Sequence, residues 1–77
     1  MAYYLCIGSD DLSEASRHHR LRDAVDAFRE VAEEHTQYGN TPPGGTIHIA
    51  AKRSECVDDA DYYLSVGPRG GVRCERV

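Results

Sequence analysis

The sequence has no long apolar run and only three cysteines, and both shortages exclude whole classes of protein. A membrane-spanning helix needs about 20 consecutive apolar residues, and no stretch approaches that length. Cys6, Cys56 and Cys74 are an odd number without a C-x-x-C spacing, which predicts free thiols in a reducing compartment. The N-terminus lacks the basic start of a signal peptide. We therefore expect a cytoplasmic protein that does not enter a membrane.

Residues suited to catalysis or metal binding are also few and poorly spaced. The histidines at 18, 19, 35 and 48 lack the paired spacing of zinc ligands, and no Ser-His-Asp or Cys-His arrangement is indicated. Cys56 lies among acidic residues, which predicts a raised pKa and a poor nucleophile. The acidic turn around it lacks the alternate ligands and central glycine of a calcium loop. We expect no metal, no cofactor and no enzyme activity.

Length and charge limit the remaining classes. The 77 residues make one domain, residues 1–77, with room for about one helix on one sheet. A 40% hydrophobic and 29% charged composition argues against disorder. Thirteen acidic and nine basic residues give a net charge of −4. This balance argues against non-specific binding to nucleic acid or to anionic membranes, so we expect no direct nucleic-acid partner.

Local patterns predict elements in the order β-α-β-β-β. Alternating and apolar residues predict four strands, at residues 2–8, 46–52, 61–66 and 72–77. Apolar residues at helical spacing predict one helix, at residues 19–38. Residues 9–16 form a polar connector with room for one helical turn after Asp11, since Asp11 and Glu14 resemble a capping box. The glycines at 67–71 are those of a tight hairpin loop; the alternative is a phosphate cradle with Arg69 and Arg73.

The helix is the strongest of these predictions. Its apolar stripe recurs at three- and four-residue spacing and comprises Leu21, Ala24, Val25, Phe28, Val31, Ala32 and His35. Phe28 is the largest of them and lies mid-stripe, so we expect it at the centre of the core. Gly39 suits a left-handed C-cap, and Pro42-Pro43 prevents the helix from continuing.

These elements predict an α+β fold in which a single four-stranded sheet carries one long helix on one face. A crossover through the helix would make strand 46–52 parallel to strand 2–8. The last three strands would form a meander. The first strand must then pair beside the second or beside the fourth, which leaves the orders 1-2-3-4 and 2-3-4-1 open.

A single helix covers one face of the sheet and leaves the other open. The covered face is expected to contain Tyr3, Leu5, Ile7, Ile47, Ile49, Tyr62, Leu64, Val66, Val72 and Cys74. By alternation, the open face contains Tyr4, Cys6, His48, Ala50, Tyr63, Ser65, Arg73 and Glu75. Two tyrosines, a histidine and an arginine on an open face predict a contact surface.

The outer face of the helix carries five acidic residues, which we call the acidic ridge: Asp23, Asp26, Glu30, Glu33 and Glu34. They fall within about 100° of one another and span about 16 Å of helix. Their axial spacing of roughly 3–4 Å is close to the charge spacing along one DNA strand. Asp58 and Asp59 could extend the ridge. One interpretation of the ridge is a negative surface that contacts a basic partner. The alternative is an ordinary solvated helix face.

In its length, acidic balance, single sheet with one helix and lack of catalytic residues, the chain resembles the small anti-CRISPR proteins of phages and mobile elements. The stretches LRDAVDAFREVAEEH and GTIHIA…DYYLSVGPRGGVRCER are also similar to small phage and bacterial proteins. The resemblance implies an inhibitor in the bacterial host cell that binds a CRISPR effector complex and blocks its DNA binding. The size and general character of the chain favour a type I complex as the target. It assigns no individual residue a role.

The sequence therefore supports three hypotheses. The first is a non-enzymatic inhibitor that presents its acidic surface to a basic protein partner. The second is a nucleic-acid or nucleotide binder that uses Tyr4, Tyr63, His48 and Arg73 on the open sheet face. The third is a structural module whose open face is buried in a homodimer. The chain could be a monomer or a homodimer under the first two.

Overall fold

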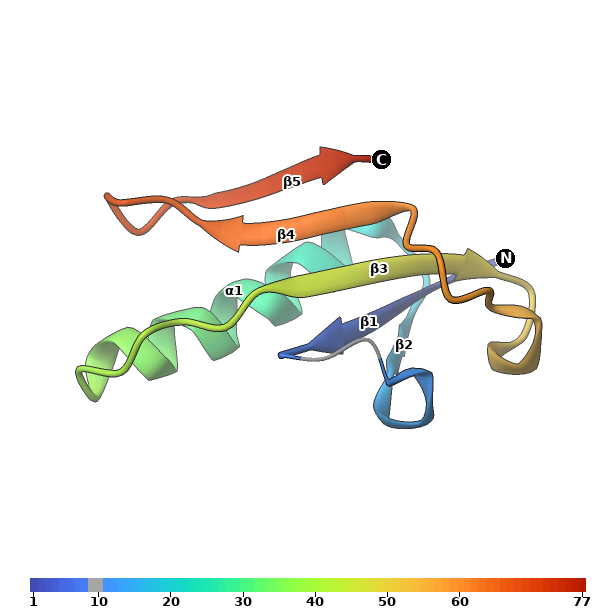
Figure 1. The fold of residues 1–77 in the computed structure, drawn as a ribbon, viewed down its shortest axis with the longest axis horizontal. Coiled ribbons are helices and arrows are strands. Elements are labelled where there is room, and N and C mark those ends of the chain that lie inside the picture. The colour runs from blue at the N-terminus through green and yellow to red at the C-terminus, as the bar shows by residue number, and fades with distance from the viewer. Residues whose placement is uncertain (9–10) are drawn as a thin grey trace.

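A computed structural model describes residues 1–8 and 11–77, and in it one helix lies against one face of an antiparallel sheet (Figure 1). The sheet contains five strands: β1 (Ala2–Ile7), β2 (Ser16–His18), β3 (Gly45–Ala50), β4 (Tyr62–Val66) and β5 (Val72–Arg76). The helix is α1 (Leu21–Gln37), and two 3₁₀ turns are η1 (Leu12–Glu14) and η2 (Arg53–Glu55). The α+β class and the single helix on one face are confirmed.

The expected number of strands is wrong, because the polar connector contains a strand. β2 pairs with β1 through Tyr3–His18, Tyr4–Arg17 and Leu5–Ser16, and it adds an outer edge to give the order β2-β1-β3-β4-β5. The one turn expected after Asp11 is present as η1, and the Asp11 carboxylate caps it by accepting from the Ser13 amide. Ser9 and Asp10, also in the predicted connector, lie outside the described residues.

The predicted parallel pairing of the first two long strands is also wrong. β1 runs antiparallel to β3, with Ala2 opposite Ala50 and Ile7 opposite Gly45. The reason is that the chain enters α1 from β2, which has already reversed the direction of β1. The two strands joined by the helix are therefore β2 and β3, which run parallel to each other with β1 between them.

Helix α1 ends where the sequence predicts. Gly39 has a left-handed φ of 74°, and its amide donates to the Thr36 carbonyl while the Asn40 amide donates to the His35 carbonyl. This pair of bonds is a Schellman motif, which satisfies the last carbonyls of the helix. The first turn has no such device, because the N-cap is Arg20, whose side chain makes no capping hydrogen bond.

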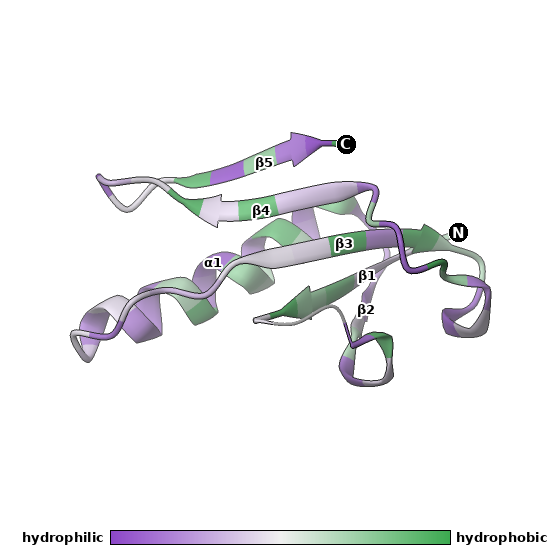
Figure 2. Ribbon diagram, viewed as in Figure 1, coloured by the Kyte–Doolittle hydropathy of each residue, from purple (hydrophilic) through white to green (hydrophobic). Residues whose placement is uncertain are grey.

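The main core lies between α1 and the sheet. Phe28 is fully buried at its centre, as expected, among Leu5, Ala24, Ala32, Ile47 and Leu64. Figure 2 shows hydrophobic residues along the inner side of α1 and along β1 and β3. Of the residues expected on this face, Cys74 is exposed, because it lies on the outermost strand, at the margin of the helix.

The opposite face of the sheet was predicted to be open, but it is open along only part of its width. Under η1 and η2 lies a second cluster, made of Ala2, Tyr4, Cys6, Ala15 and Ala50, with Leu12 and Cys56 packed against it. The two turns, whose sequences are those of polar connectors, therefore form a partial third layer over β1 and β3. Only the part of this face formed by β4 and β5 remains exposed.

The β4–β5 hairpin has the predicted loop. The Gly70 amide donates to the Gly67 carbonyl, the Gly67 amide donates to the Gly71 carbonyl, and Gly70 has a φ of 82°. This is a type I turn followed by a left-handed residue, a common three-residue hairpin connection. At the other end of β4, the Asp61 carboxylate accepts from the Ile49 amide at 2.7 Å and continues the edge contact with β3.

Candidate functional site

The acidic ridge lies on the solvent side of α1, and all five of its carboxylates are exposed. Ala24, Phe28 and Ala32 are buried on the other side of the same helix. With about 100° of rotation per residue, the ridge is centred roughly opposite these three residues. The sheet therefore fixes the helix by its apolar side and presents the ridge outward.

One ridge residue has a partner. The Arg29 guanidinium donates to the Asp26 carboxylate at 2.8 Å, and both side chains are about half exposed. Among the residues that the structure describes, this is the only ion pair, so the other four ridge carboxylates have none. Glu30 lies four residues after Asp26 and four before Glu34, and these like-charge pairs repel one another. The ridge is thus a concentration of negative charge, and within the described residues an ion pair compensates it only at Asp26.

Asp58 and Asp59 are exposed, but they do not extend the ridge. The neighbouring Val57 carbonyl accepts a hydrogen bond from His48, whose side chain lies on the same face of the sheet as its cross-strand partner Tyr4, away from α1. The two acidic groups therefore lie on different sides of the molecule. Asp61, from the same acidic turn, has a structural role at the β3 edge instead.

The predicted contact surface on the sheet is reduced by the third layer. Tyr4 is only 4% exposed and His48 only 1% exposed, so neither can contact a partner on the surface. Tyr63 is 54% exposed, and Ser65, Arg73 and Glu75 are exposed beside it. Register places Tyr63 opposite Glu75 and Ser65 opposite Arg73. We call these four residues the hairpin face.

His48 and Arg53 hold the third layer in place, a role that the sequence did not reveal. The Nδ1–H of His48 donates to the Val57 carbonyl at 3.0 Å, and its Nε2 accepts from the Thr46 hydroxyl at 3.2 Å. Because a carbonyl can only accept, these bonds assign the proton to Nδ1. The Arg53 guanidinium donates to the Ser13 and Ala15 carbonyls and so ties η2 to η1. The only signal in the sequence was a histidine within an alternating apolar strand.

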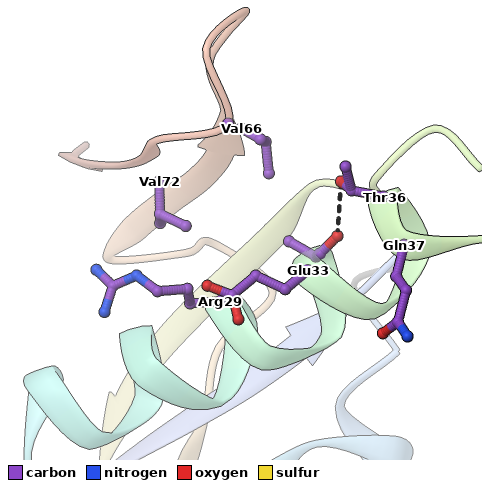
Figure 3. A pocket seen from close by; sticks show the side chains of 8 residues that line it. Arg29, Glu33, Thr36, Gln37, Val66 and Val72 are labelled. Carbon is purple, nitrogen blue, oxygen red and sulfur yellow. Dashed lines mark hydrogen bonds between the residues drawn. The ribbon is translucent and has the colours of Figure 1, made fainter. Parts of the chain in front are cut away.

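A shallow cleft of about 340 Å³ lies between the second half of α1 and the β4–β5 hairpin (Figure 3). Ala32, Val66 and Val72 form its apolar walls, and Arg29 and Glu33 border it. The Thr36 hydroxyl at its margin donates to the Ala32 carbonyl at 3.0 Å. The cleft suits an apolar side chain of a partner, and it adjoins the ridge through Glu33.

None of the three cysteines lines this cleft, and Cys56 has the raised pKa that the sequence predicts. Burial is the main cause of the raised pKa of Cys56, and the negative charge of Asp61 adds to it. Burial also raises the pKa of Cys74. Within residues 1–8 and 11–77, no three ligating side chains gather closely enough to hold a metal ion.

Helices that could cross a membrane are missing from the described part of the chain. Comparison of the chain with protein-family models, with curated proteins and with solved structures returned no match.

Proposed function

We propose that this protein is a non-enzymatic, protein-binding inhibitor whose acidic ridge occupies a basic surface of its target. The observation that carries the proposal is the set of four exposed ridge carboxylates without an ion-pair partner in the described residues. A domain of this size has a small margin of stability, and like charges along α1 reduce that margin. Binding to a basic partner would relieve the repulsion.

The geometry of the ridge suits such a contact. The helix is fixed by Phe28 on its inner side and by the Schellman motif at its end, so its carboxylates are presented on a preformed scaffold. Preformed surfaces lose little conformational entropy on binding. Five carboxylates over about 16 Å approximate the charge spacing of a nucleic-acid strand, which a groove of Lys and Arg residues is built to receive.

The target that we propose is a type I CRISPR effector complex in the cytoplasm of a bacterial host cell. This choice follows from the resemblance of the chain to small anti-CRISPR proteins in size, charge and the lack of catalytic residues. Such a complex must bind DNA through basic channels, and an acidic ridge placed in one of them would exclude the DNA.

The nucleic-acid-binding alternative is less well supported. A base-stacking platform needs several exposed aromatic or planar side chains on one sheet face. Tyr4 and His48 are buried, and the remaining Tyr63 lies directly opposite Glu75, whose charge repels phosphate.

Two triple variants test the ridge. The first, Glu30→Gln with Glu33→Gln and Glu34→Gln, removes three ridge charges and leaves the Asp26–Arg29 pair in place. The control, Glu14→Gln with Glu55→Gln and Asp59→Asn, removes the same charge from exposed positions elsewhere. We expect the ridge variant to bind a purified type I effector complex at least tenfold more weakly than the parent, a loss of about 1.4 kcal/mol. Equal losses in both variants would show that net charge alone matters, and no loss in either would remove the ridge from the interface.

A further inference from the structure

The sheet has two free edges, and they differ in how well they are protected. β2 is an edge of three residues, too short to template much pairing. β5 is an edge of five residues, Val72–Arg76, without a proline. In Figure 1 its outer side faces away from the rest of the chain. Exposed edge strands of this kind pair readily with other strands unless something blocks them.

The hydrogen bonds of the hairpin identify which groups face the free edge. The Gly67 amide donates to the Gly71 carbonyl and the Val77 amide to the Asp61 carbonyl, so odd-numbered residues of this strand turn their backbone toward β4. In an antiparallel ladder the intervening residues point the other way. The amides and carbonyls of Val72, Cys74 and Arg76 therefore face outward, toward the free edge. Within the described residues, no hydrogen bond is formed on that side of β5.

We propose that β5 pairs antiparallel with β5 of a second copy of this chain, on a two-fold axis at Cys74. In that register Cys74 lies opposite its own copy, and Val72 lies opposite Arg76 of the second copy. The outward backbone groups of Val72, Cys74 and Arg76 then bond across the axis. The two five-stranded sheets become one continuous sheet.

Charge complementarity identifies the second copy as the occupant. Arg73 and Glu75 project from the same face, because they lie opposite Ser65 and Tyr63 on β4. On the proposed axis, Arg73 lies opposite Glu75 of the second copy, and symmetry repeats the pair. Opposite charges at such cross-strand positions stabilise antiparallel pairing.

The same charges reject the neighbouring registers. A shift of two residues in one direction would place Arg73 opposite Arg73 of the second copy, and a shift in the other direction would place Glu75 opposite Glu75. Like charges directly opposite each other are destabilising. A shift of one residue would exchange the two faces and turn the bonded backbone groups away from the partner. β5 is therefore complementary to itself in the one register that also uses its full length.

A charge exchange tests the proposal, with mass measured by sedimentation across the micromolar range. We expect the parent to dimerise, to twice the 8.6 kDa of the chain. Arg73→Glu alone leaves two acidic residues on each edge, and Glu75→Arg alone leaves two basic ones. Each variant should raise the dimer dissociation constant at least about tenfold, because attraction is replaced by repulsion at both symmetric pairs.

An equimolar mixture of the two single variants should dimerise again, because each Glu of one then faces an Arg of the other. The doubly exchanged Arg73→Glu/Glu75→Arg protein should also dimerise by itself. A thiol-specific bifunctional crosslinker should join parent chains through Cys74, and Cys74→Ser should abolish that product while Cys56→Ser retains it. A monomer at all concentrations would overturn the proposal, as would a dimer that survives both single variants unchanged. Neither result bears on the acidic ridge, which lies on a different element.

Discussion

At the scale of single residues, Phe28 is the side chain on which the core depends. It is fully buried between α1 and the sheet, and the stripe pattern alone was sufficient to predict its position. We expect Phe28→Ala to lower the free energy of unfolding by about 3–5 kcal/mol. Because small domains have roughly 5–15 kcal/mol in total, much of the variant should be unfolded at physiological temperature. Chemical denaturation measures this loss, and an unchanged midpoint would place the core elsewhere.

Gly45 is required by the same ring. A Cβ atom there would lie 2.9 Å from Cδ1 of Phe28 and 3.1 Å from the Cys6 carbonyl oxygen, closer than side-chain atoms normally approach. Gly45→Ala should therefore cost about 1–3 kcal/mol of stability, since ring and strand must shift. Gly44→Ala is the matched control, because its Cβ would meet only the Leu64 carbonyl at an ordinary 3.6 Å. Equal melting temperatures for the two variants would contradict this account of the close packing.

His48 determines how tightly the third layer is held. Replacing it by leucine removes the bond to the Val57 carbonyl, so the loop that carries Cys56 should open more often. Burial and Asp61 raise the pKa of the Cys56 thiol, so at neutral pH less of it is reactive thiolate than in an exposed cysteine. His48→Leu should therefore increase the rate of Cys56 alkylation severalfold, with the rate at Cys74 as the internal control. Alkylation that speeds equally at both cysteines would indicate general unfolding instead.

For Tyr4 and His48, the sequence could predict the face of the sheet but not the burial of the side chains. Strand alternation assigned both to the correct face of the sheet, away from the helix. It could not show that this face is covered, because the covering turns are polar and short. Their attachment depends on Arg53 reaching carbonyls about forty positions earlier in the chain, a contact that no local pattern encodes.

At the scale of elements, α1 was predictable and β2 was not. A 17-residue helix with a continuous stripe and a glycine stop carries its signal within its own sequence. β2 is three polar residues, Ser16–His18, and only its pairing with β1 makes it a strand. Missing β2 led to the wrong direction for β3, because the helix connects β2 to β3 rather than β1 to β3.

The ridge should reduce the stability of the helix that carries it. Glu30→Gln removes the repulsion with both Asp26 and Glu34 and keeps the Asp26–Arg29 ion pair. Each like-charge pair costs about 0.2–0.5 kcal/mol, so the variant should be more stable by up to about 1 kcal/mol. Thermal unfolding at low salt is the measurement, with Glu55→Gln as the control. A lower melting temperature for Glu30→Gln would mean that Glu30 has a stabilising contact and that the ridge is not under repulsive strain.

At the scale of the whole molecule, the two faces of the sheet have separate assignments. The helix side presents the acidic ridge beside an apolar cleft, and the other side is closed by the third layer except at the hairpin face. The sequence could predict the ridge because it depends only on helical spacing. It could not predict that Asp58 and Asp59 lie away from the ridge, or that the cleft exists, because both depend on how distant elements pack.

Competition for an effector complex tests whether the ridge takes the place of DNA. A purified type I effector complex is held with a labelled DNA duplex carrying its target, and this protein is added at two salt concentrations. We predict that the protein displaces the DNA, that displacement weakens as salt rises, and that the ridge triple variant is at least tenfold less effective. Protein and DNA bound together on the same complex, at either salt concentration, would contradict the proposal that an acidic helix occupies the DNA-binding surface.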